Sequence, residues 1–320
     1  MPSSDDERAE PRPGLHLLRV PLAGHTIGHV NVYALEADDG ILLVDCAWAT
    51  EETRRQLARL IARLGYRPSD VSRVLLTHEH ADHSGQSGWL QDLGARIGLH
   101  PAGWGPSAPR SADVMLAETT AWLEAAGVPR DVWPVAVENA THLHERAWQG
   151  APDFGLVDGQ IIEHGPFLLE VLHVAGHTPG SVVFHERSHR VLFTGDFLYA
   201  RSPFSPLLRA VGDADPMTEY LGSLSRIAEL DVDVALAGHY EGFADVRGRV
   251  ATVERHHLGR AALVAELAEE TGPVAWRIAA RIPRRRPWAA LSVAQQVSAT
   301  AEVFAHLARL NTIAADRYAG

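Results

Sequence analysis

The chain of 320 residues contains no lysine and a single cysteine, and each shortage removes a class of chemistry. All 29 basic residues are arginines, which excludes a Schiff-base lysine and the lysine of a phosphate-binding P-loop. Because Cys46 has no second cysteine to pair with, an intrachain disulfide and a cysteine-based zinc module are also excluded. Histidines, of which there are 18, and carboxylates remain as the candidates for chemistry.

Long hydrophobic runs and an excess of positive charge are missing as well. No stretch reaches the roughly 20 apolar residues of a membrane span, and the first ten residues are polar and acidic rather than signal-like. We therefore expect a cytoplasmic protein that does not bind a membrane. The formal net charge of −11 argues against nucleic acid as a partner, because nonspecific binding relies on many contacts from basic residues to phosphates.

Apolar patterns divide the chain into three parts. Residues 1–13 carry prolines and charges without apolar periodicity, which predicts a disordered tail. Residues 14–245 alternate short apolar strands with amphipathic helices, for example a helix at 50–64 and a strand at 71–77, and predict an α/β domain. Residues 246–320 contain only helical patterns, with a break at 282–287, and predict a small C-terminal helical domain.

Residues 101–150 differ from their surroundings. They hold four of the eight tryptophans and a predicted helix at 112–126. This segment is either an insertion that lies over a functional site or a helix packed on the sheet, and both interpretations stay open.

The densest group of possible metal ligands is the run His78-Glu79-His80-Ala81-Asp82-His83, which follows an apolar strand. In an extended segment alternate side chains point the same way, so we expect His78, His80 and Asp82 to share one side. Two imidazoles at positions i and i+2 can bind one zinc ion, and Asp82 and His83 can turn toward a second. The spacing differs from the helical H-E-x-x-H motif, because no histidine follows at i+4.

Three further segments place a side chain of the ligand type where a predicted strand ends, namely His177, Asp196 and His239. Loops at strand ends are the usual place for functional residues on a rigid scaffold. We therefore predict that these residues complete a metal site with the 78–83 run. The alternative is a solvated turn that is merely rich in histidine.

The ordered series of Asp45, the 78–83 run, His177, Asp196 and His239 resembles the motif set of the metallo-β-lactamase superfamily over residues 15–245. The resemblance implies an αβ/βα four-layer sandwich with a dinuclear metal site at the edge of two packed sheets. We expect two Zn²⁺ ions per chain, with iron or manganese as alternatives, because the ligands suit all three metals.

The resemblance also implies a role for each motif residue. The first metal would be held by His78, His80 and His177, and the second by Asp82, His83 and His239. Asp196 would bridge the two metals, and Asp45 would orient a metal-bound histidine.

Two details favour one branch of the superfamily. Asp196 stands where β-lactamases with a thiolate ligand carry cysteine, and together with His239 it resembles glyoxalase-II-like hydrolases and lactonases. The run 29–33 and the helical tail resemble the β-lactamase-like protein 2 group, whose members have a C-terminal winged-helix-like domain.

These resemblances imply a hydrolase in which a hydroxide shared by two metals attacks the carbonyl of a small ester, thioester or lactone. The alternatives are a phosphodiesterase or ribonuclease with the same two-metal site, a β-lactamase, and an iron-dependent sulfur dioxygenase. A homodimer is compatible with the sequence.

Several residues are candidates for contact with substrate. Asp82 would orient the attacking hydroxide. Tyr199 lies three residues after Asp196, an offset at which some acyl-homoserine lactonases carry a tyrosine that contacts substrate, although packing at a strand end is an alternative. Phe204 would line an acyl pocket or cover the sheet edge.

Charged and histidine-rich segments outside the motif set have simpler explanations. Arg284 and Arg285 would bind a carboxylate or phosphate of a coenzyme A or glutathione handle, or would lie in a solvated loop. We expect Glu79 to be a solvent-facing spacer, and His256 and His257 to be surface or core-edge residues rather than ligands.

Overall fold

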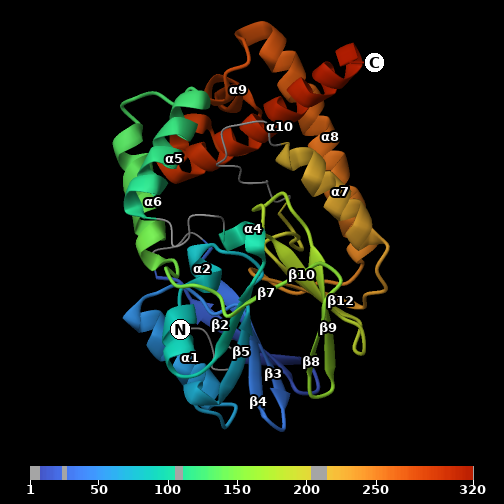
Figure 1. Cartoon of the computed structure of the whole chain (residues 1–320). Coiled ribbons are helices and arrows are strands. Elements are labelled where there is room, and N and C mark those ends of the chain that lie inside the picture. Colours follow the sequence, from blue (N-terminus) through green and yellow to red (C-terminus); the bar gives the residue numbers. More distant parts are fainter. Residues whose placement is uncertain (1–7, 24–26, 105–110, 203–214, 320) are drawn as a thin grey trace.

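The computed structural model describes residues 8–23, 27–104, 111–202 and 215–319, which form two packed β-sheets with helices around them (Figure 1). The seven-stranded sheet runs in the order β1 (Arg8–Arg12), β2 (Leu15–Pro21), β3 (His29–Ala37), β4 (Gly40–Val44), β5 (Val71–Leu75), β6 (Arg96–Leu99) and β7 (Phe154–Gly155). The five-stranded sheet runs in the order β12 (Val234–Ala237), β11 (Val191–Gly195), β10 (Val182–Glu186), β9 (Phe167–His173) and β8 (Ile161–His164).

The helices fall into a group that precedes β8 and a group that follows β11 along the chain. The first comprises α1 (Glu51–Ala62), α2 (Ala81–Ser84), α3 (Ser87–Asp92), α4 (Pro101–Trp104), α5 (Ala112–Ala125) and α6 (Trp133–Arg146). The second comprises α7 (Pro216–Ala228), α8 (Val246–Thr271), α9 (Ala275–Arg281) and α10 (Val293–Ala319). Short 3₁₀ turns occur at Pro68–Asp70 and Trp288–Ala290.

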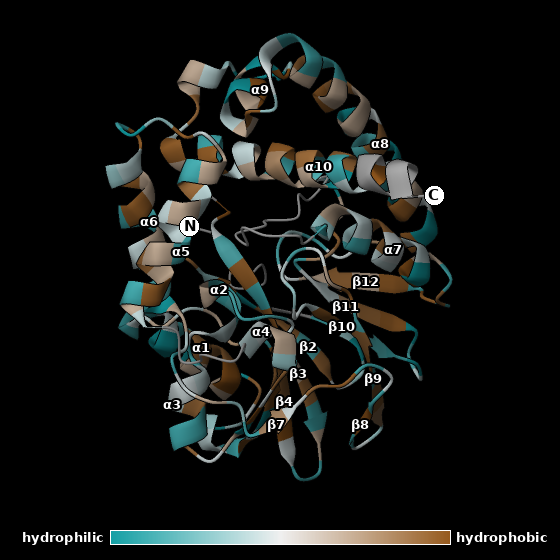
Figure 2. Ribbon diagram, turned by 45° about the horizontal axis from the view of Figure 1, so that its top comes forward, coloured by the Kyte–Doolittle hydropathy of each residue, from teal (hydrophilic) through white to brown (hydrophobic). Residues whose placement is uncertain are grey.

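Alternating side chains of the strands produce the layers. In β4, Leu43 packs on the outer face with residues of α1, whereas Leu42 packs between the two sheets. In β11, Phe193 packs between the sheets, whereas Leu192 packs outward with residues of α7 and α8. Both faces of each sheet are therefore covered, and Figure 2 shows the hydrophobic strands inside. This arrangement confirms the predicted four-layer α/β sandwich.

The N-terminal segment is more ordered than the sequence indicated. The expectation that residues 1–13 form a disordered tail is wrong for Arg8–Arg12, which form β1 and pair antiparallel with β2. The predicted helix at 50–64 is α1, and its first turn is capped by Thr50, whose side chain accepts a hydrogen bond from the backbone N–H of Thr53.

The C-terminal segment is helical, as the sequence predicted. The structure describes all of residues 246–319, and this stretch contains helices without a strand, so it lacks the hairpin of a winged helix. Val250 and Val253 of α8 pack on the outer face of the five-stranded sheet together with Ala305 of α10. The boundary at residue 245 stays a prediction.

The tryptophan-rich segment packs against these C-terminal helices. Trp122 of α5 shares a core with Val264 of α8 and Val303 of α10, and no strand residue belongs to that core among the residues described. The interpretation of the predicted helix 112–126 as packed on the sheet is therefore wrong, although Trp104 and Trp148 at the ends of the segment pack against the core of the seven-stranded sheet. In Figure 1, α5 and α6 (green) lie beside α10 (red).

A buried polar cluster joins α8 to α10. His257 Nδ1 lies 3.5 Å from His306 Nε2, and both side chains are fully buried, so the expected surface or core-edge place is wrong for His257. Glu302 Oε1 lies 3.4 Å from His256 Nε2 and 3.5 Å from Arg260 Nε. The residues His256, His257 and Glu302 are of the metal-binding type, but the guanidinium of Arg260 already neutralises Glu302 and would repel a cation there.

Candidate metal centre

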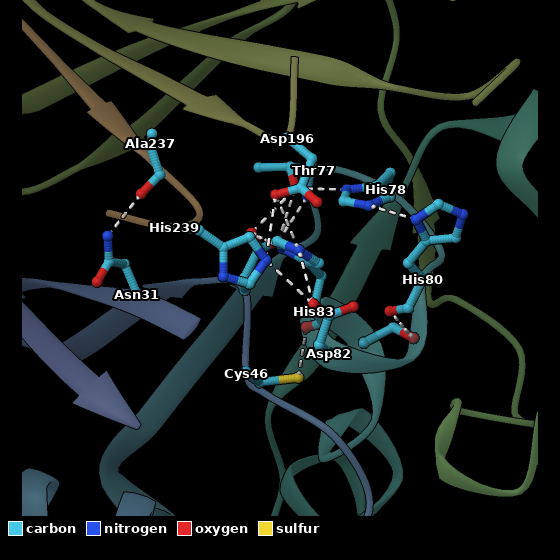
Figure 3. A network of polar contacts seen from close by, with 12 residues as sticks. Asn31, Cys46, Thr77, His78, His80, Asp82, His83, Asp196, Ala237 and His239 are labelled. Atoms are coloured by element: carbon cyan, nitrogen blue, oxygen red, sulfur yellow. Dashed lines mark hydrogen bonds and ion pairs between the residues drawn. The ribbon is translucent and has the colours of Figure 1, made fainter. Parts of the chain in front are cut away.

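The side chains predicted to bind metal lie together at one edge of the sandwich, in the loops that follow β5, β11 and β12 (Figure 3). His78 and His80 follow β5, Asp196 comes directly after β11, and His239 follows β12. His177 lies in the turn between β9 and β10. Strand ends from both sheets thus converge on one place, as the sequence pattern indicated.

Three imidazoles form the first group. The Nε2 atom of His177 lies 3.2 Å from His78 Nε2 and 3.0 Å from His80 Nδ1, and the last two atoms lie 3.0 Å apart. Zinc–nitrogen bonds of about 2.0–2.1 Å place tetrahedral ligands about 3.3 Å apart, so this triangle is close to the spacing of three ligands around one ion.

The second group contains two carboxylates and two imidazoles. Asp82 Oδ2 lies 3.1 Å from His239 Nε2, and Asp196 Oδ1 lies 3.2 Å from His83 Nε2. Asp196 also faces the first group, because its Oδ2 atom lies 3.8 Å from His177 Nε2. The two oxygens of one carboxylate thus point toward the two groups, which is the position that a bridging ligand occupies.

Asp82 belongs to the second group because the chain turns after His80. Residues Ala81–Ser84 form the short helix α2, so the alternation that places His78 and His80 together ends before Asp82. The expectation that Asp82 points the same way as these two histidines is wrong. The expectation that Asp82 and His83 turn toward a second group agrees with the structure.

Acceptors behind the second group set which nitrogen of each histidine carries a proton. His83 Nδ1 lies 2.8 Å from Asp45 Oδ2, and His239 Nδ1 lies 2.7 Å from the carbonyl oxygen of His29. A carboxylate and a carbonyl only accept, so each Nδ1 donates and each Nε2 turns toward the cluster. Such support is typical of histidines that bind a metal.

Three buried side-chain atoms of this cluster have no hydrogen bond of good geometry within the described part of the chain. They are His83 Nε2, His239 Nε2 and Asp196 Oδ1. Buried polar atoms without a partner are costly, and a cation placed among these lone pairs would satisfy all three. Gly238 keeps the space open, because a Cβ atom there would lie 2.7 Å from Asp196 Oδ1 and from His83 Cε1. The residues therefore fit divalent metal ions.

Comparison with known proteins agrees with this geometry. Residues 25–239 match the sequence profile described as the metallo-beta-lactamase superfamily. The chain belongs to this superfamily.

Three relatives show how far the similarity extends. The chain is 31% identical over 243 residues to the probable metallo-hydrolase YqjP of Bacillus subtilis (strain 168), covering 73% of each chain. It is 32% identical over 231 residues to the acyl-coenzyme A thioesterase MBLAC2 of Bos taurus, covering 68% of this chain and 75% of MBLAC2. The crystal structure of a metallo-beta-lactamase family protein from Thermus thermophilus superimposes with a TM-score of 0.79 and 30% identity, covering 95% of each chain. These matches confirm the family resemblance and identify the chain as a hydrolase of this superfamily.

The two groups of the superfamily site differ in protonation. Burial lowers the pKa of His78 well below its usual range and that of His177 to about 4, so both imidazoles are neutral ligands at pH 7. Burial would raise the pKa of Asp82 and of Asp196, yet the neighbouring His83 holds both below their usual range. Burial would lower the pKa of His83, yet Asp196 and Asp82 raise it well above its usual range. The first group is therefore neutral, and in the second group two carboxylates face a protonated His83, whose proton a bound cation would displace.

The run 29–33 supports the loop that carries His239. The side-chain amide of Asn31 donates to the carbonyl oxygens of Ala237 (2.9 Å) and Tyr240 (2.8 Å), and the Tyr33 hydroxyl donates to Ala237 (2.7 Å). In the sequence, the run 29–33 indicated only a resemblance to one branch of the family. A polar Asn in an otherwise apolar strand was the available signal, because a buried amide needs hydrogen-bond partners.

Glu79 links two ligand loops. Its Oε2 atom accepts a hydrogen bond of 2.8 Å from the hydroxyl of Thr178, which follows His177. The expectation that Glu79 is a solvent-facing spacer is therefore wrong. Its partner comes from a distant part of the chain, so the sequence around Glu79 contained no sign of it.

Tyr199 lies beside the second group. The side chain is buried, and its ring centroid is 6.1 Å from that of His239 and 5.5 Å from that of Tyr240. Burial, followed by the charge of Asp196, raises the pKa of the Tyr199 hydroxyl well above its usual range. The phenol is thus held in its neutral form next to the carboxylate of Asp196.

Of the other predicted substrate residues, Arg284 and Arg285 are not brought to this site. Phe204 lies outside the described residues. The guanidinium of Arg284 donates to the carbonyl oxygens of Ala279 (2.5 Å) and Ile282 (3.2 Å). These carbonyl groups lie at the C-terminal end of α9. Arg285 is exposed in the segment after α9, and both ribbon views place α9 beyond α10 when seen from α2. Arg284 therefore has a structural partner.

Proposed function

We propose that this protein is a dinuclear zinc hydrolase that cleaves the thioester bond of a small molecule. The observation that carries the metal-centre part is the position of Asp196, whose two oxygens face the two ligand groups. The relative MBLAC2, named as an acyl-coenzyme A thioesterase, supports a thioester over an ester or a lactone.

Different residues of the chain would have different roles in such a reaction. Two bound divalent cations would polarise the substrate carbonyl and lower the pKa of a water toward 7. Asp82 has a side chain that is 15% exposed, whereas those of His83 and His239 are fully buried. We therefore assign Asp82 to orienting the attacking water. Tyr199 is buried, and its ring centroid lies 6.1 Å from that of His239.

The experiment that tests this function compares the wild type, one ligand variant and one control variant on a small panel of substrates. The zinc-loaded wild type and His80→Ala are assayed with an acyl-coenzyme A, an acyl-glutathione thioester, an acyl-homoserine lactone, a chromogenic cephalosporin and a single-stranded RNA. The exposed His142, on α6, supplies the matched control His142→Ala.

We expect thioester hydrolysis by the wild type and by His142→Ala. His80→Ala should lose at least about a hundredfold in rate, because loss of a ligand weakens the first metal position. Turnover of RNA or cephalosporin alone would replace the proposal with a nuclease or a β-lactamase. Full activity of His80→Ala would show that the site is assigned wrongly.

A further inference from the structure

The loop after Asp196 is held in place by β11 and by helices that pack on the sheet. The hydroxyl of Thr194 donates to the carbonyl oxygen of Leu198 (2.8 Å), and the hydroxyl of Tyr220, from α7, donates to that of Phe197 (2.9 Å). These bonds fix the part of the loop next to the ligand Asp196. The segment from residue 199 to residue 202 is held by a different element.

That element is the first turn of α8. Arg249 donates from Nε to the carbonyl oxygen of Tyr199 (2.5 Å) and from Nη2 to that of Ser202 (2.6 Å). Hydrogen bonds from a charged donor are roughly twice as strong as neutral ones, and the planar guanidinium fixes two acceptors at once. A single side chain thus holds both ends of the segment.

The position of Arg249 is itself set by the start of its helix. Asp245 adopts a left-handed conformation (φ 52°) and caps α8, because its side chain accepts the backbone N–H of Gly248 at 3.0 Å. A Cβ atom at Gly248 would lie within 3 Å of the Asp245 carboxylate, so the close cap needs glycine there. The cap therefore fixes the turn that carries Arg249 relative to Asp245.

The held segment carries a side chain that reaches the metal centre. The ring of Tyr199 is buried, and its centroid lies 6.1 Å from that of His239. A shift of the Tyr199 backbone would therefore move this ring relative to His239, a predicted metal ligand.

We propose that Arg249 is a positioning residue, which holds the Tyr199 ring beside His239 and so couples the first turn of α8 to the metal centre. The inference rests on the metal-centre part of the proposed function and not on the proposed substrate. It gives the C-terminal helices a direct influence on the ligand geometry.

The test uses the full-length protein loaded with Co²⁺, so that no substrate is needed. The visible absorption of bound cobalt reports ligand geometry, and the rate of metal transfer to the chelator EDTA reports how firmly the site is held. The variants are Arg249→Ala, Tyr199→Phe and the double variant. Arg247→Ala is the matched control, because Arg247 lies in the same turn and contacts only the carbonyl oxygen of Ala228 among the bonds described (3.3 Å).

We expect Arg249→Ala to bind the same number of cobalt ions as the wild type, with an altered spectrum and release at least about tenfold faster, as the loss of charged hydrogen bonds predicts. Tyr199→Phe should also speed release, and the double variant should match Arg249→Ala within about twofold, because Arg249 acts through Tyr199. Arg247→Ala should behave as the wild type.

Unchanged spectrum and release in Arg249→Ala, wild-type behaviour of Tyr199→Phe, or effects that multiply in the double variant would each overturn the proposal. If the alanine variant does not fold, Arg249→Gln gives the same measurement with a neutral side chain that still favours helix. A wild-type protein that binds cobalt but hydrolyses no thioester would refute the proposed substrate and leave these readouts intact.

Discussion

At the scale of single residues, the metal centre depends on side chains that hold the ligands rather than on ligands alone. Asp45 is the clearest case: it is buried and adopts a left-handed conformation (φ 63°), which is unfavourable for a residue other than glycine. Its carboxylate accepts hydrogen bonds from the backbone N–H (2.8 Å) and the hydroxyl (2.9 Å) of Thr77, and from His83 Nδ1 (2.8 Å). These donors hold Asp45 in its strained conformation, and Asp45 in turn orients His83.

Replacing Asp45 by asparagine should weaken the second metal position selectively. The amide keeps the size of the carboxylate but turns one acceptor into a donor, so His83 loses the partner that directs Nε2 to the cluster. Loss of such support typically lowers metal affinity by about 10–100-fold. A zinc titration against a chelator should show one weakened step and one unchanged step, and Asp131→Asn, at an exposed position, should leave both unchanged. Two wild-type steps in Asp45→Asn would contradict the role of Asp45.

At the scale of helices and strands, the sequence predicted those elements whose own pattern determines them. The apolar runs of β4 and β11 are buried on both sides and were evident from the sequence. The pair of residues in β7 and the polar strand β1 were missed, because strand formation there depends on a neighbouring strand rather than on an apolar pattern. The helix α2 was missed for a similar reason, since four residues carry no periodicity, and this changed the expected direction of Asp82.

The contact between α8 and α10 should make the protein sensitive to acid. Burial lowers the pKa of His306 to about 3, with Glu302 opposing the shift and His257, Arg260 and Arg309 adding to it. The unfolded chain, with a pKa of about 6.5 for this group, binds more protons, so stability is complete above pH 6.5 and falls as the pH drops toward 3.

We expect this histidine to contribute up to about 1.4 kcal/mol of lost stability per pH unit below pH 6. Urea unfolding of the metal-free protein at pH 7, 6 and 5 should therefore show a steeper loss for the wild type than for His306→Gln. His142→Gln, at an exposed position, serves as the control. Equal pH slopes in all three proteins would mean that His306 is not protonated on unfolding in this range.

At the scale of the whole molecule, the helical C-terminal segment and the sandwich share their cores. Val253 of α8 belongs to the same core as Val183 of β10, although the predicted boundary at residue 245 lies between them. The helix α5 in turn packs on α8 and α10. The sequence indicated a change of composition at this boundary, but it could not show that side chains on either side of it pack together, because such contacts join residues far apart in the chain.

Shared cores predict that the metal-free protein unfolds in a single cooperative transition. Val253→Ala and Val183→Ala each remove two buried methyl groups from one core, and each should lower the free energy of unfolding by about 1–3 kcal/mol. Because the core belongs to both segments, both substitutions should shift the same calorimetric peak, and Val135→Ala, at an exposed position, should not. Two separate peaks, each moved by only one of the core substitutions, would show that the helices fold independently.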